Sequence, residues 1–374
     1  MPAVRIKDQI EFHRASPEVS VDDHVRHRVI ELGQLVMARD RVYLDKCFWI
    51  NLRAARTSGS GPQAAVDLLS SLTAGVRSGR LICPISDALF LELMKQTDPA
   101  TRGATAKLID DLSCGVSLSP GPTRTATEVA HFFHANVGHD VHALEHLVWT
   151  KVPYVLGVQH PAHEAFPEDE QLVIQKAFFD HLWEVPLSTM VDTIGSAWPF
   201  GSHYADLAER LNRDNATHAL AMKSFAQVYR DEINGVLELA APIATKVLTS
   251  MARKALGPSI NPSAEELEAT TRQCLALLRA AVRKPVGKQA LRTLHIGALL
   301  HAALRWNRRQ KLDANDLFDF HHAEAALGYC DAFLTDGPMH SLLMQRHLGI
   351  ESGFTCRVIS SIEAAADWVR CRLA

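Results

Sequence analysis

Arg41-Val-Tyr-Leu-Asp45-Lys-Cys-Phe-Trp-Ile50 is a short apolar segment with one acidic residue at its centre. Val42 to Leu44 predict a strand, and Asp45 stands directly at the carboxyl end of that strand. In open parallel sheets, ligands bind in the crevice beyond the carboxyl ends of the strands. The segment therefore predicts a strand that delivers a carboxylate to a functional site.

Three later acidic residues stand at comparable places in the chain. Glu92 lies in the first turns of a predicted helix that follows the apolar run 81–85. Asp319 lies in a predicted helix, and Asp336 directly follows the strand predicted after that helix. We expect the fold to bring these three residues to Asp45.

The order of the elements predicts an α/β fold. The predicted strands are residues 42–44, 81–85, 115–118, 331–335 and 355–359. They alternate with helices, and a strand–helix–strand unit normally gives parallel neighbours, so we expect a doubly wound, mainly parallel sheet.

A long helical region interrupts this alternation. Residues 123–288 have helical periodicity, with 154–158 as the one weak strand signal and a predicted helix at 219–228. We predict a helical insertion that packs as a subdomain over one edge of the sheet. The predicted organisation is a helical segment 1–39, a first α/β part 40–122, the insertion 123–288 and a second α/β part 289–374.

Composition sets the broad class. The chain has 374 residues, of which 47% are hydrophobic and 22% charged, which is typical of a globular protein. Its seven cysteines form no C-x-x-C pair, so we expect reduced thiols rather than a zinc ribbon or a disulfide scaffold. The amino terminus lacks an apolar signal region and no run of about 18 apolar residues occurs, so we expect a cytoplasmic protein without membrane contact.

The ordered acidic residues resemble those of the PIN domain, the fold of many metal-dependent ribonucleases. The resemblance covers residues 40–120 and 290–370. It implies that Asp45, Glu92, Asp319 and the pair Thr335-Asp336 form the site, and the spacing of sixteen residues from Asp319 to Thr335 is the one expected.

The sequence also departs from the family pattern. Cys47 stands where an asparagine commonly follows the first aspartate, which removes a supporting hydrogen bond. Thr335 and Asp336 are adjacent, whereas the family often has one residue between them. Asp316 and Asp331 are extra acidic candidates that could replace a neighbour in the site.

The chemistry of clustered carboxylates indicates a divalent cation. Four carboxylates in one crevice repel each other unless a cation neutralises them, and an all-oxygen set favours Mg²⁺ or Mn²⁺. We expect Asp45 and Asp336 to be the main ligands, with Glu92 and Asp319 completing the shell or orienting the attacking water. The Thr335 hydroxyl would hold a ligand or a phosphate. The predicted activity is hydrolysis of RNA by a metal-dependent endoribonuclease.

A basic stretch precedes Asp319. Residues 279–311 contain nine lysines or arginines and no acidic residue, although the whole chain has a net charge of −3. One interpretation is a solvated helix face. The other is an RNA-binding patch, in which Arg305, Arg308 and Arg309 bind phosphates and Trp306 stacks on an unpaired base.

Two other functions are open at this stage. Residues 131–146 contain five histidines at 131, 134, 139, 142 and 146, and His139-Asp140 is similar to the paired ligands of HD-type metal phosphohydrolases. In that interpretation His142 and His146, four residues apart, share a helix face. The third interpretation is a catalytically inactive nucleic-acid-binding module. The sequence does not decide which RNA is cut, whether a partner protein inhibits the enzyme, or the oligomeric state.

Overall fold

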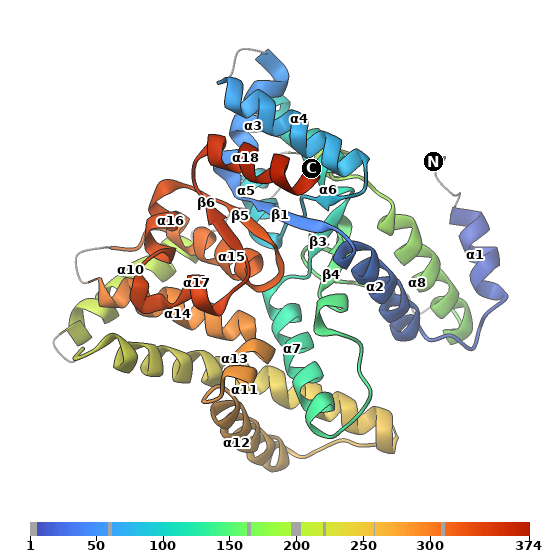
Figure 1. Cartoon of the computed structure of the whole chain (residues 1–374). Coiled ribbons are helices and arrows are strands. Elements are labelled where there is room, and N and C mark those ends of the chain that lie inside the picture. The colour runs from blue at the N-terminus through green and yellow to red at the C-terminus, as the bar shows by residue number, and fades with distance from the viewer. Residues whose placement is uncertain are drawn as a thin grey trace.

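A small parallel sheet lies at the centre of the molecule (Figure 1). The computed structural model describes residues 6–58, 62–162, 166–195, 203–219, 222–257, 259–307 and 311–374. The sheet has the strand order β2-β1-β5-β6, and its strands are β1 (Asp40–Leu44), β2 (Leu81–Ile82), β5 (Ala332–Leu334) and β6 (Arg357–Ile359). All neighbours are parallel, as predicted, and Leu44 pairs with Leu334.

Helices cover both faces of this sheet because successive strand residues point to opposite sides. Val42 and Leu44 share one core with α3 (Lys46–Ser58), α4 (Gln63–Arg77) and α18 (Ile362–Leu373). Tyr43 shares the other core with α2 (Val21–Met37), α14 (Arg292–Trp306) and α15 (Ala314–Tyr329). The predicted α/β class is confirmed, as a mostly helical chain around four short parallel strands.

The predicted third strand does not extend this sheet. β3 (Val116–Leu118) pairs antiparallel with β4 (Trp149–Lys151), and one bridge between Ile85 and Ser117 is its link to the main sheet. β4 lies inside the region expected to be helical. The strand expected at 154–158 is wrong, because Val152–Tyr154 forms a 3₁₀ turn directly after β4.

The remaining described helices include some that were not predicted individually, such as Ile6–Arg14 and Ile350–Gly353. They are α1 (Ile6–Arg14), α5 (Asp87–Met94), α6 (Pro99–Ser113), α7 (Gly121–Asn136), α8 (Glu168–Trp183), α9 (Leu187–Ile194), α10 (His203–His218), α11 (Phe225–Leu256), α12 (Ala264–Ala281), α13 (Pro285–Ala290), α16 (Gly337–Leu343) and α17 (Ile350–Gly353), with 3₁₀ turns at Leu144–His146 (η1) and Arg346–Leu348 (η4). The helix expected at 219–228 is wrong at residues 222–224, which precede α11. Ser224 caps α11, its hydroxyl accepting the Gln227 N–H, so that helix begins at Phe225.

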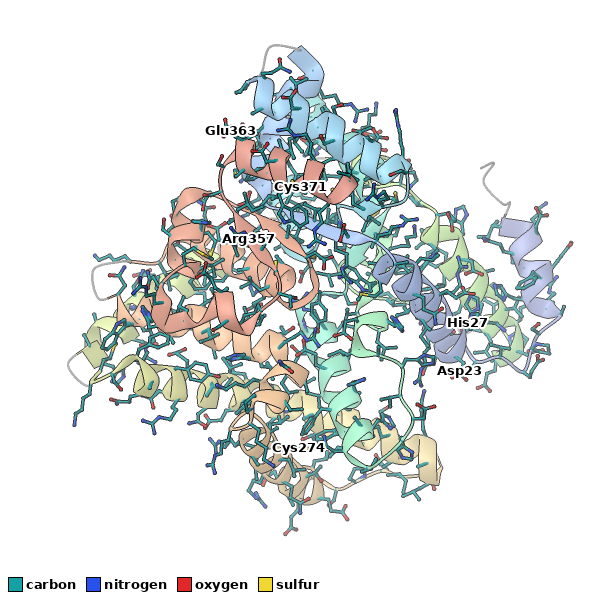
Figure 2. All side chains as sticks on the ribbon, viewed as in Figure 1. Asp23, His27, Cys274, Arg357, Glu363 and Cys371 are labelled. Carbon is teal, nitrogen blue, oxygen red and sulfur yellow. The ribbon has the colours of Figure 1, made fainter. Side chains whose placement is uncertain are left out.

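The region predicted as an insertion contributes to two cores. Helices α7, α11 and α12 pack around Val129, Leu237 and Cys274, away from the sheet (Figure 2). By contrast, Phe179 and Trp183 of α8 belong to the core that contains Tyr43. The region is therefore not uniformly separate from the α/β part, and the boundaries 123 and 288 stay a prediction.

Helix α11 is, by length and composition, apolar enough to cross a bilayer, and it is the one such helix among the described residues. This is weak evidence, because core helices of soluble proteins meet the same criterion. In this structure α11 packs against α7, α12 and α14. The cytoplasmic location stays a prediction.

Candidate active site

The pairing of β1 with β5 brings Asp45 and Asp336 together. The Asp336 N–H donates to Asp45 Oδ2 at 3.0 Å, and the Cys47 N–H donates to Asp45 Oδ1 at 3.0 Å. Asp336 is the N-cap of α16, and its Oδ1 accepts the Met339 N–H at 2.8 Å. The two predicted main ligands thus lie side by side at the carboxyl ends of neighbouring strands.

Thr335 is the single residue between β5 and Asp336. It is buried, and its N–H donates to the Ile359 carbonyl, so it continues the pairing with β6. Asp336 then starts a helix directly after it. The adjacency of Thr335 and Asp336 therefore still leaves Asp336 beside Asp45.

Asp319 faces the same crevice from α15. Its carboxylate accepts no hydrogen bond from the described residues. Burial and, to a smaller extent, the nearby carboxylates of Asp336, Glu92 and Asp45 raise the pKa of Asp319 to about 7, while His322 opposes them. The fold thus brings the four predicted acids, which we call the acidic site, within electrostatic reach of one another.

Glu92 is held by a hydrogen-bonded network that runs through the core. Its Oε2 lies 2.9 Å from Nε2 of His322, and its Oε1 lies 3.4 Å from Nζ of Lys46. The Tyr43 hydroxyl lies 2.7 Å from Nδ1 of His322 and 2.6 Å from the Ser86 hydroxyl. Burial raises the pKa of Glu92, but His322 and Lys46 outweigh it and hold that pKa below its usual value. Glu92 is therefore a carboxylate of fixed orientation.

This network is the part of the site that the sequence predictions missed. His322 follows Asp319 by three residues, so both occupy one face of α15. Lys46 directly follows Asp45. The helical spacing between Asp319 and His322 was the signal available in the sequence.

The two extra acidic candidates occupy different places. Asp316 forms a capping box with Asp313, whose N–H donates to Asp316 Oδ2 at 2.8 Å, one turn before Asp319. Asp331 precedes β5, at the opposite end of that strand from Asp336, and forms an ion pair with Arg41 at 2.7 Å. The fold does not bring Asp331 to the acidic site.

The acidic site offers donors of the type that Mg²⁺ and Mn²⁺ prefer. Asp45, Asp319 and Asp336 fit this role, and the uncompensated carboxylate of Asp319 is the observation that supports a cation. Glu92 is already engaged by His322 and Lys46. A bound ion would draw its ligand atoms close together. Within the described part of the chain, one set of three side chains has all its ligand atoms within 4.8 Å of one another, and it lies elsewhere, at His13, His24 and Asp180. The carboxylates therefore stand further apart than they would around a bound ion.

The histidine-rich segment does not form the expected helix. Helix α7 ends at Asn136, His142 follows in an extended link and His146 belongs to η1, so the prediction that the latter two share a helix face is wrong. His131 Nε2 lies 3.1 Å from the His142 carbonyl, and the rings of His134 and His139 meet edge to face at 5.5 Å. Three of these histidines line a cavity of about 600 Å³.

The basic stretch 279–311 is partly neutralised by acidic partners. Arg305 on α14 forms an ion pair with Glu232 on α11, and Trp306 packs against a small buried cluster of Met222, Val228 and Ala302. Arg308 and Arg309 lie outside the described residues. Two further ion pairs join this stretch to acids: Arg279 with Glu238 at 2.7 Å and Arg292 with Glu145 at 2.8 Å.

Comparison of the chain with models of known protein families, with curated proteins and with solved structures finds no match.

Proposed function

We propose that this protein is a divalent-metal-dependent endoribonuclease and that the acidic site is its active site. The observation that carries the proposal is the hydrogen bond from the Asp336 N–H to Asp45 Oδ2. It joins two acids from distant parts of the chain at the carboxyl ends of two parallel strands, where open α/β sheets bind ligands.

Asp45, Asp319 and Asp336 would hold Mg²⁺ or Mn²⁺. Such an ion, when bound, supplies a more acidic water and stabilises the charge that develops on a phosphodiester. Without it, Asp319 holds its proton more tightly, because burial first and then the carboxylates of Asp336, Glu92 and Asp45 raise its pKa to about 7.

Glu92 and Lys46 have separate roles in this proposal. The network of His322, Tyr43 and Ser86 fixes the Glu92 carboxylate, which would accept a proton from the attacking water. The Lys46 side chain is 38% exposed, so its ammonium group is able to donate to a phosphate oxygen while it remains close to Glu92. Proton acceptance and phosphate binding both need a side chain held in one orientation, and the hydrogen-bonded network provides this orientation.

The other two functions considered from the sequence have less support. The histidine-rich segment contains no group of three converging metal ligands. An inactive nucleic-acid-binding module would not need an uncompensated carboxylate beside two others. The RNA substrate itself is inferred from the resemblance to PIN domains and from the basic stretch.

Replacement of single ligands tests the proposal. Asp45→Asn and Asp336→Asn keep the side-chain shape and remove a charge, so each should lose Mn²⁺ binding and most RNA cleavage while circular dichroism shows an intact fold. The control is the double replacement His139→Ala, His142→Ala, which should keep cleavage within about tenfold of wild type, or roughly 1.4 kcal/mol in activation free energy.

Two results would reject the proposal. One is a purified wild-type protein that cleaves no RNA with either Mg²⁺ or Mn²⁺. The other is a reversed ranking, in which the histidine variant is inactive and Asp45→Asn retains activity.

A further inference from the structure

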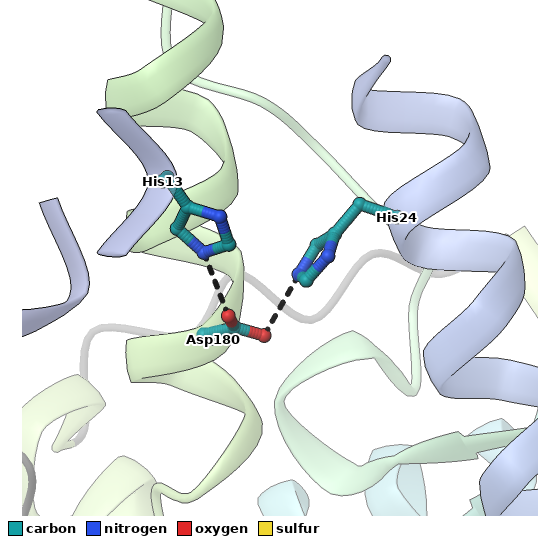
Figure 3. A group of neighbouring side chains, drawn as sticks. All are labelled: His13, His24 and Asp180. Atoms are coloured by element: carbon teal, nitrogen blue, oxygen red, sulfur yellow. Dashed lines mark hydrogen bonds and ion pairs between the residues drawn. The ribbon is translucent and has the colours of Figure 1, made fainter. Parts of the chain in front are cut away.

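Two histidines and an aspartate meet where α1, α2 and α8 come together (Figure 3). His13 Nε2 lies 2.9 Å from Asp180 Oδ2, and His24 Nε2 lies 3.0 Å from Asp180 Oδ1. The ligand atoms of all three side chains lie within 4.8 Å of one another. The cluster joins the amino-terminal helices to a helix more than 150 residues later in the chain, and it is separate from the acidic site.

The burial of His13 is unusual for its helix. His13 is 2% exposed and is the one buried residue of α1, whereas the apolar Phe12 beside it is 67% exposed. A surface helix normally buries an apolar stripe. The contact of α1 with the rest of the molecule therefore centres on a polar metal-ligand side chain rather than on an apolar face.

The charges around Asp180 leave it available to a cation. Arg28 Nε lies 3.6 Å from Asp180 Oδ1, and the same guanidinium lies over the Trp183 ring and 3.6 Å from Glu184. Lys176, the other nearby cation, donates to the carbonyls of the α1–α2 connection at 2.8 and 2.9 Å. Burial raises the pKa of this carboxylate, but His24, His13 and the shared Arg28 outweigh it and lower that pKa, and Tyr154 also lies within its electrostatic reach.

We propose that His13, His24 and Asp180 form a binding site for Zn²⁺. Zinc is bound by imidazole nitrogen and carboxylate oxygen at about 2.0–2.2 Å, so ligand atoms of a tetrahedral site stand roughly 3.3 Å apart. His13 Nε2 lies 2.9 Å from Asp180 Oδ2, which is close to that spacing, and His24 Nε2 lies 3.0 Å from the other carboxylate oxygen, Oδ1. With one ligand atom taken from each side chain, all three lie within 4.8 Å of one another, so the side chains need only a small shift to surround an ion. The imidazoles favour a borderline ion such as Zn²⁺ over Mg²⁺, and water would occupy the fourth position.

Binding requires a change of tautomer in both histidines. In the hydrogen-bonded cluster each Nε2–H donates to Asp180, so the proton of each neutral ring has to move to Nδ1 before Nε2 presents a lone pair. Acidification protonates the rings and competes with the ion, so affinity falls as the pH falls. The bound ion would fasten α1 to α2 and α8 and would stabilise the folded chain by mass action.

The test uses the purified full-length protein without a histidine tag, stripped with EDTA and titrated with Zn²⁺ or Co²⁺ alone. We expect one Zn²⁺ per chain in competition with a chromophoric chelator, the visible absorption of four-coordinate Co²⁺, and a higher melting temperature with Zn²⁺. His24→Gln and Asp180→Asn should each lower the Zn²⁺ affinity at least about 100-fold. Loss of a residue that only hydrogen-bonds to a metal ligand already lowers metal affinity by about 10–100-fold, and these two residues would be ligands themselves.

Matched controls separate this site from other metal ligands. His27→Gln changes an exposed histidine on the same helix (Figure 2) and should leave Zn²⁺ affinity unchanged. Asp45→Asn should also retain it, which separates this site from the proposed nuclease centre. If the dissociation constant of wild type for Zn²⁺ is above about 10 μM, which corresponds to a binding free energy of roughly −7 kcal/mol, the proposal is wrong. The three side chains are then only a hydrogen-bonded connection between helices. The same conclusion follows if His24→Gln and Asp180→Asn bind as tightly as His27→Gln does.

Discussion

Asp319 shows how one residue couples the acidic site to the stability of the protein. Its pKa is about 7 in the folded chain, against an ordinary value near 3.8, because burial and the neighbouring carboxylates disfavour its charge. The folded state therefore keeps a proton that the unfolded state has already lost. The free energy of unfolding must fall as the pH rises through this window, from about 4 to about 7.

Replacement by asparagine removes this dependence. In EDTA, Asp319→Asn should gain stability over wild type as the pH rises, and the gain should be roughly 2–3 kcal/mol larger at pH 8 than at pH 5. Urea unfolding at the two pH values measures it. With saturating Mn²⁺ the difference should shrink or reverse, because the variant has lost a ligand. A gain in stability that is the same at pH 5 and pH 8 would contradict the assignment of a raised pKa to Asp319.

Individual residues also show which parts of the two sites could be predicted from the sequence and which could not. Asp45 was predictable because it directly follows a short apolar run, and Asp336 because Thr335 alone separates it from such a run. The spacing of His322 from Asp319 places it on the same helix face, but its contact with Glu92 was not predictable, since the two residues are 230 positions apart. The same holds for His13 and Asp180, which are 167 positions apart.

The contact between α2 and η1 depends on a missing side chain. A Cβ on Gly33 would lie 2.2 Å from the His146 carbonyl oxygen, and backbone cannot move aside as a flexible side chain does. Gly33→Ala should therefore destabilise the protein by about 1–3 kcal/mol, as overpacking does elsewhere. Chemical denaturation measures this change.

Gly235 on α11 is the matched control. A Cβ there meets no atom within 4 Å, so Gly235→Ala should stabilise the protein by about 0.5–1 kcal/mol through helix propensity alone. Equal effects of the two replacements would show that α2 and η1 are not packed this closely.

At the level of elements, the long helices were the most predictable. Helices such as α11 and α12 span many turns, so their periodicity is visible locally. β4 has three residues, of which Thr150 and Lys151 are polar, so it has no apolar pattern that indicates a strand. Whether β3 joins the main sheet or pairs with β4 depends on packing between distant segments. Local patterns do not encode that choice.

Across the whole molecule, part of the basic charge in the described residues is neutralised locally by ion pairs. The net charge is −3, and three arginines of the stretch 279–311 already have acidic partners. Binding of an RNA backbone therefore depends on the basic residues that keep no such partner. Arg305, predicted from the sequence to bind RNA, is better placed to hold α14 against α11.

Variants of the basic stretch separate these roles. In an Asp45→Asn background, which should bind RNA without cutting it, Arg305→Ala should leave the salt dependence of binding unchanged. It should lower the free energy of unfolding by about 1.5–3 kcal/mol, because Glu232 loses a charged hydrogen-bond partner. The double replacement Arg308→Ala, Arg309→Ala should instead flatten the log–log salt slope by about 1.4, or 0.7 for each lost phosphate contact on a single strand. Fluorescence anisotropy at several KCl concentrations measures the slope. If Arg305→Ala flattens the slope by 0.7 without loss of stability, Arg305 binds RNA and its pair with Glu232 is incidental.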